Sequence, residues 1–170
     1  MERIKVEELT NTEMDIMIGE LLLHGYPAPF VQFFGPHMSD QRINLGQWFR
    51  NPEGKAMAFG IIHAIAERER PDMILFGADG RTVCIKHDKL TEEQRGMIED
   101  ESLTVSRAVA LGLGEAVEVL NVTGNIPDGT GYSVMQIYRR EPDGGITLLE
   151  RTARWVDRIA GNAAFFQANR

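Results

Sequence analysis

The sequence predicts a single α+β domain over residues 1–170, with a mainly antiparallel sheet of about five strands and three or four helices packed on one face. Helix-start signals precede apolar segments at Thr10 and again at Asn51-Pro52. From residue 115 onward, strand-like segments are joined by short turns, which can only connect antiparallel neighbours. Helices lying over an antiparallel sheet form the α+β layer arrangement.

The first helix is expected at about residues 11–24. Thr10 and Glu13 have the spacing of a capping box, in which each side chain bonds the backbone of the other residue. Apolar residues then follow at helical spacing, and Gly25 with Pro27 provides a stop signal.

Residues 26–50 are rich in aromatic side chains but are interrupted by prolines and glycines, so we expect a loop that is packed down onto the domain. A short helix from Ser39 or Asp40 toward Phe49 is one interpretation, because either residue can act as an N-cap. Gly46 weakens this interpretation, since glycine lowers helix stability by about 1 kcal/mol relative to alanine.

A second long helix begins at Asn51, the expected N-cap, with Pro52 at the first helical position. It has to end before Pro71, because the residue that precedes a proline avoids the helical region. Between Ala56 and Ala66 the chain is apolar nearly all round, which predicts a helix at the centre of the core.

A β-hairpin is expected next, with strands at 73–76 and 82–87 and a turn at Ala78-Asp79-Gly80. Thr91 and Gln94 form another capping box, which predicts a helix through about Asp100. The stretch 104–113 fits either a helix or an extended segment.

The last third of the chain predicts a three-stranded meander. Its strands are expected near 117–120, at 132–140 and at 146–150, with an alternative end of the last strand at Trp155, and a strong turn signal lies at 141–145. The glycine-rich stretch 124–131 joins the first two strands. Backbone amides of such a loop can cradle an anion, but it lacks any phosphate-loop motif, so a hairpin connection is the favoured role.

The composition limits the function classes. A net charge of −7 disfavours nucleic-acid binding, which normally depends on a face of Lys and Arg. The lone Cys84 excludes an internal disulfide, and the charged start at Met1 lacks the apolar core of a signal peptide, so a cytoplasmic protein is expected. No apolar run reaches the roughly 18 residues that cross a bilayer, so no membrane association is expected.

Histidines, the thiol and carboxylates provide the candidates for catalysis. Cys84 and His87 suggest a nucleophile and its base, although residues three apart in a regular strand point to opposite faces. His63 and Glu67 lie one helical turn apart and can share a metal ion, but two ligands do not make a site, and we assign no metal. A third group would have to come from elsewhere, for example from His24, His37 or Asp40.

The binding candidates lie in two regions. Arginines gather in the last hairpin and its exit, where their guanidinium groups can hold an anion or pair with neighbouring acids: Arg139, Arg140, Arg151, Arg154 and Arg158. Aromatic residues of the segment 26–49 are either bulky core anchors or an exposed binding surface: Phe30, Phe33, Phe34 and Trp48.

We therefore expect a non-catalytic binding or protein-interaction domain that uses the aromatic segment 26–49 or a sheet edge, with a homo-oligomer or another protein as partner. The alternative is a small hydrolase or transferase with a site assembled from His24, His37, His63 and nearby Asp or Glu, assisted by a metal in one version. The sequence identifies no cofactor.

Overall fold

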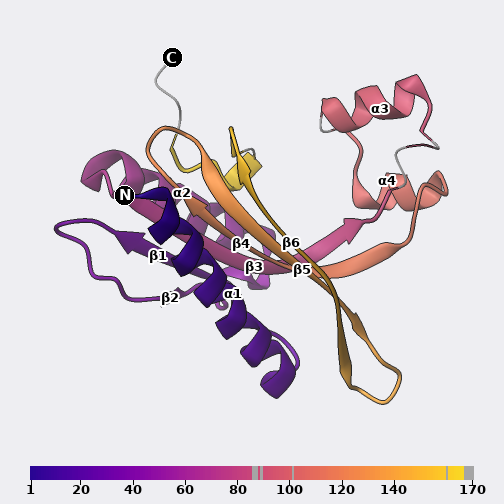
Figure 1. The fold of residues 1–170 in the computed structure, drawn as a ribbon, viewed down its shortest axis with the longest axis horizontal. Helices are drawn as coiled ribbons and strands as arrows, with labels where there is room; N and C mark the ends of the chain where they lie inside the picture. Colours follow the sequence, from indigo (N-terminus) through magenta and orange to yellow (C-terminus); the bar gives the residue numbers. More distant parts are fainter. Residues whose placement is uncertain (86–87, 89, 101, 160, 167–170) are drawn as a thin grey trace.

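The computed structural model describes residues 1–85, 88, 90–100, 102–159 and 161–166 (Figure 1). Its elements follow in the order α1 (Arg3–His24), β1 (Phe30–Phe34), β2 (Ile43–Asn44), the 3₁₀ helix η1 (Trp48–Arg50), α2 (Pro52–Glu69), β3 (Met73–Val83), α3 (Glu92–Glu99), α4 (Val105–Ala110), β4 (Ala116–Asn125), β5 (Gly131–Arg140), β6 (Ile146–Val156) and η3 (Gly161–Ala163). The strands form one antiparallel sheet in the order β2-β1-β3-β4-β5-β6. The α+β class is confirmed, with six strands where about five were expected.

The long helices pack on opposite faces of the sheet, which corrects the expectation of helices on one face. The α1-side core joins α1 to all the long strands and includes Met14, Met17, Leu75, Leu120 and Val134. The α2-side core joins α2 to β1 and β3 and includes Phe33, Phe59, Ile62, Ile74 and Phe165. β1 and β3 carry buried apolar side chains at consecutive positions, so both of their faces need cover.

The helix α1 begins at Arg3, well before the predicted start. Thr10 is buried inside the helix, and its hydroxyl donates to the carbonyl oxygen of Val6 at 2.6 Å instead of capping a new helix. Val6 belongs to the α1-side core, so packing extends the helix past the local start signal. The predicted end is confirmed, because Gly25 adopts the left-handed conformation at φ 84°.

Glycines allow α1 to approach the sheet closely. A Cβ atom on Gly77 of β3 would lie 2.8 Å from the sulfur of Met17, and one on Gly124 of β4 would lie 2.7 Å from the hydroxyl of Thr10. Side chains at these two positions would push the helix away from the strands.

The helix α2 has the predicted limits, with Asn51 as N-cap and Arg70 after its last turn. The Asn51 side chain accepts a hydrogen bond from the Gly54 amide at 2.7 Å. The expected central position is wrong, because α2 buries only one side, through Ala58, Phe59, Ile62 and Ala66. Its opposite side is exposed.

The aromatic segment forms strands where a short helix was expected. β1 buries Phe30 and Phe34 on the α1 side and Val31 and Phe33 on the α2 side, while β2 pairs with the start of β1. The region of the predicted helix contains only β2 and η1. Burial on both faces favours the extended conformation in β1, whereas β2 is exposed and is extended through its pairing with β1.

The predicted hairpin at 73–87 is a single strand, β3, up to Val83. The expected turn residues pair in register with β4, with Asp79 opposite Leu120 and Gly80 opposite Val119. Ten residue pairs join β3 to β4, and this pairing outweighs the local turn signal. Residues 86 and 87 of the predicted second strand lie outside the described residues.

Helices α3 and α4 form an excursion between the ends of β3 and β4, and Figure 1 shows it projecting away from the body. The predicted capping box of α3 is confirmed, because the Thr91 and Gln94 side chains each accept from the other residue's amide. No residue of α3 is buried. The ambiguous stretch at 104–113 is helical over α4.

The predicted meander of β4, β5 and β6 is confirmed, with an irregularity in register between Gln136 and Tyr138. The glycine-rich loop is a hairpin connection in which Ile126 donates to the carbonyl of Thr130 at 3.1 Å. Asp128 accepts from the amide and hydroxyl of Thr130, and these bonds lower the pKa of its carboxyl group. A loop that carries an ionised carboxylate does not favour an anion.

Within the described residues, no helix combines the length and the apolar character needed to cross a membrane.

Candidate binding groove

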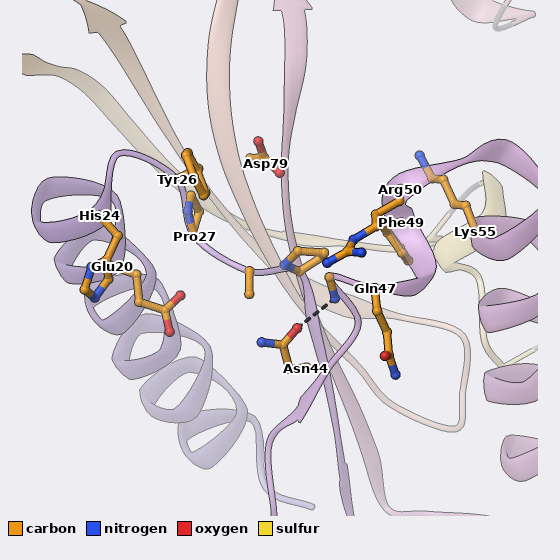
Figure 2. Close-up of a pocket in the computed structure, with 13 residues that line it drawn as sticks. Glu20, His24, Tyr26, Pro27, Asn44, Gln47, Phe49, Arg50, Lys55 and Asp79 are labelled. Atoms are coloured by element: carbon orange, nitrogen blue, oxygen red, sulfur yellow. Dashed lines mark hydrogen bonds between the residues drawn. The ribbon is translucent and has the colours of Figure 1, made fainter. Parts of the chain in front are cut away.

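An open groove of about 1080 Å³ lies between the two ends of the aromatic segment. Its lining comes from five parts of the chain: Glu20 and His24 of α1, Tyr26 to Pro29, Asn44 with residues 46, 47, 49 and 50, Lys55 of α2, and Asp79 of β3. Figure 2 shows Phe49, Arg50 and Lys55 on one side, opposite Glu20 and His24. We call this feature the groove.

The wall that follows α1 is set by local backbone chemistry. Gly25 turns the chain out of the helix, and Tyr26 directly after it is 72% exposed. Pro27 and Pro29 are buried and stiffen the wall. The Leu45 amide donates to the Pro29 carbonyl at 2.7 Å, which ties the two sides of the segment together. The groove therefore has a rigid wall with an exposed phenol ring beside it.

The opposite wall is cationic. Arg50 ends η1 and Lys55 lies in the first turn of α2, so both flank the N-terminus of that helix. The Lys55 ammonium lies 5.4 Å from the centre of the Phe49 ring, a cation–π distance. Phe49 in turn packs on Phe59 and Phe76 of the α2-side core. Among the described residues, neither Arg50 nor Lys55 forms an ion pair.

Glu20, the acidic residue of the α1 wall, is held by an arginine that also lies near Glu13 of the same helix. Arg42 binds both oxygens of Glu20, at 2.5 and 3.2 Å, and its guanidinium lies 4.1 Å from the centre of the Phe30 ring. It also lies 3.6 Å from Glu13, whose carboxyl pKa is raised by burial despite the opposing effect of Arg42. The charge of Glu20 is therefore largely compensated, whereas the cations of the other wall face solvent.

The aromatic candidates from the sequence are mostly core residues, the alternative that the sequence left open. Phe30, Phe33 and Phe34 are at most 7% exposed. Trp48 is half-buried against the α2-side core. The rings that line the groove are those of Tyr26 and Phe49. The accessible rings of the aromatic segment are therefore at its two ends.

The catalytic candidates do not converge in the described part of the chain. His24 lines the groove, whereas His63 lies on α2, near the Phe165 ring and 3.2 Å from the carbonyl oxygen of Asn162. Glu67 is exposed. His87 lies outside the described residues, so its proposed pairing with the exposed Cys84 cannot be described.

Metal-ligand geometry is likewise not found: within the described ranges, no three His, Cys, Asp or Glu side chains gather as ligands. The hydrolase or transferase hypothesis stays a prediction that no observation favours.

Three of the five arginine candidates, Arg139, Arg140 and Arg151, hold acids of the chain itself. Arg139 pairs with Glu141 at 2.9 Å. Arg151 binds Asp15 at 2.7 Å and the Asn11 side chain at 2.9 Å, which links β6 to α1. These contacts match the alternative of a mixed-charge surface.

Sequence reasoning missed four charged residues of the groove, Glu20, Arg50, Lys55 and Asp79. Arg50 and Lys55 flank the Asn51-Pro52 helix start, so two cations beside a helix N-terminus were a usable signal. Asp79 had been assigned to a turn, and only the pairing of β3 with β4 places it beside the groove.

No family model, curated protein or solved structure matches this chain.

Proposed function

We propose that this chain is a binding domain whose groove takes up a short, extended peptide segment of a partner protein, with an acidic group of the peptide held by Arg50 and Lys55. The observation that carries this proposal is the cationic wall in a chain of net charge −7. Two cations without an ion pair among the described residues, beside a helix N-terminus, favour a carboxylate.

The shape and lining of the groove favour a peptide over a compact small molecule. Small-molecule sites are usually enclosed and mostly apolar, whereas this groove is open and mixes charged residues with Tyr26, Phe49 and prolines. An exposed Tyr ring next to a stiff proline wall provides contact area at a low cost in conformational entropy. An apolar or aromatic peptide side chain beside the acidic group would lie against these rings.

The test begins with selection from a random-peptide display library on the immobilised protein. We expect the selected sequences to combine Asp, Glu or a C-terminal carboxylate with an aromatic or aliphatic residue. Fluorescence anisotropy with a labelled selected peptide then measures affinity. We expect Arg50→Glu and Lys55→Glu each to weaken binding by about tenfold or more, because a charge-assisted hydrogen bond contributes about 1.5–3 kcal/mol.

Two controls separate the groove from general charge effects. Arg154→Glu makes the same charge change on exposed β6 and should leave the affinity unchanged. Tyr26→Ala changes no formal charge and should weaken binding if the ring is a contact. Selection of no peptide above background, or equal affinity of the Arg50→Glu and Arg154→Glu variants, would contradict the proposal.

A further inference from the structure

The outer side of α2 carries an exposed stripe along the whole helix. Its residues follow one another at helical spacing and point away from the buried side: Glu53, Met57, Gly60, Ile61, Ala64 and Arg68. We call this set the outer stripe. Met57 is 58% exposed and Ile61 is 45% exposed, although both are apolar. Apolar residues at i, i+4 and i+7 on a solvent-facing side are typical of a helix that packs against another helix.

Gly60 lies at the centre of this stripe, and no contact among the described residues accounts for a glycine there. A Cβ atom there would meet nothing within 4 Å, so packing of the described residues does not require glycine. Glycine in a helix interior costs about 1 kcal/mol relative to alanine. Small residues on a helix surface let another backbone come close, and Ala64 lies one turn further along the same side.

The charges at the two ends of the stripe are opposite. Glu53 is in the first turn of α2 and Arg68 is in its last turn. The midpoint between them falls between Gly60 and Ile61, and Met57 and Ala64 are also equidistant from that point. The stripe is therefore self-complementary when a second copy is turned end to end, because each acid then meets a base. A parallel arrangement would bring like charges together.

We propose that a second copy of this chain docks on the outer stripe, by antiparallel packing of the two α2 helices about a twofold axis between Gly60 and Ile61. Glu53 then lies opposite the partner's Arg68, and Met57 lies opposite the partner's Ala64. In the single chain Arg68 pairs with its neighbour Glu69 at 2.6 Å, with the two side chains 77% and 41% exposed. Replacing this surface ion pair by an ion pair across the dimer interface costs little free energy.

The size of the interface sets the expected affinity. α2 has 18 residues and is therefore about 27 Å long. A single helix pair of this length lies at the small end of specific interfaces, so the dimer is expected to form in the micromolar range. The surface is separate from the groove, whose α2 residue, Lys55, is not in the outer stripe.

Sedimentation equilibrium of the full chain over a range of concentrations tests the dimer. We expect the wild-type chain to associate, and Ile61→Glu to weaken the association at least about tenfold, because two carboxylates then meet near the axis. Leu23→Glu is the matched control: it places the same charge on an exposed leucine of α1 and should leave the association unchanged. Circular dichroism checks that each variant is folded.

Charge reversal tests the antiparallel arrangement itself. Glu53→Arg and Arg68→Glu should each weaken the dimer by several-fold, since each creates like-charge pairs across the axis. The double variant restores opposite charges and should recover association close to the wild-type value. A wild-type chain that stays monomeric, an Ile61→Glu chain that still dimerises, or a double variant no better than the single ones would overturn the proposal.

Discussion

The two halves of the sheet differ in how many of their faces are covered. In the first half, β1 and β3 are covered by α1 on one face and by α2 on the other. In the second half, α1 covers one face, and among the described residues no side chain of β4, β5 or β6 belongs to the α2-side core. β4, which pairs with β3, is still buried at the consecutive positions 122–125, so the open face belongs to β5 and β6. Ile74 and Leu75 of β3 are both completely buried, whereas Leu148 and Leu149 of β6 are 38% and 46% exposed.

This difference shows that the spacing of apolar residues in a strand indicates how many of its faces are packed, and not only that the segment is a strand. Consecutive apolar residues, as in Met73 to Phe76, indicate a strand with a layer on each side. Alternation, as in β5, indicates a strand with one packed and one open face. The half with two covered faces should therefore be the more sensitive to substitution.

The largest expected effect comes from adjacent truncations in the two halves. We expect Ile74→Ala and Leu75→Ala each to lower the free energy of unfolding by about 2–5 kcal/mol, because both side chains leave cavities in packed cores. Leu148→Ala and Leu149→Ala should each cost less than about 1 kcal/mol. Urea denaturation followed by circular dichroism measures all four. If Leu149→Ala lowers the free energy of unfolding as much as Ile74→Ala does, the open face in the second half of the sheet must be packed against another part of the protein.

A smaller effect is expected from two glycines of the same strand. Gly77→Ala should lower the free energy of unfolding by about 1–3 kcal/mol. The new methyl group would meet the sulfur of Met17 and the buried ring of Phe30. Gly80→Ala is the matched control, since its methyl group would meet nothing within 4 Å. Equal midpoints of thermal unfolding for the two variants would contradict the close approach of α1 to β3.

The smallest effect distinguishes the two faces of β6. Arg151 on the covered face holds Asp15 and Asn11 of α1, so Arg151→Ala should cost roughly 0.5–1 kcal/mol at low salt and less at high salt. Arg154 lies on the other face of the same strand, and no bond of its side chain is found among the described residues. We expect Arg154→Ala to leave the free energy of unfolding unchanged at both salt concentrations.

The sequence predicted those parts of the fold that local chemistry determines. The limits of α2, the capping box of α3, the stop of α1 at Gly25 and the turn before β6 all depend on residues close in sequence. The sequence did not predict what depends on distant partners. Asp79 and Gly80 pair with β4 and do not form the predicted turn. Burial of Val6 extends α1 past the start predicted at Thr10.

For the candidate site, the sequence indicated a region of the chain but not the residues that line the groove. The two ends of the aromatic segment line the groove, but the nearly continuous apolar run from Phe30 to Phe34 was not recognised as a strand buried on both faces. Once β1 takes these rings into the core, only the residues around Tyr26 and Phe49 remain for the groove. Which ring of an aromatic-rich segment stays accessible depends on strand pairing, and pairing is a long-range property.

The excursion between β3 and β4 has a consequence for how the molecule tolerates change in length. Val83 pairs with Ala116, so the strand ends on either side of the excursion are neighbours even though more than thirty positions separate them in the sequence. Lengthening or shortening such an insertion changes the entropy of loop closure only slowly. The junction at Val83 and Ala116 is thus a natural place to graft a foreign module, or to join the strands directly by a tight turn, while the sheet keeps its register.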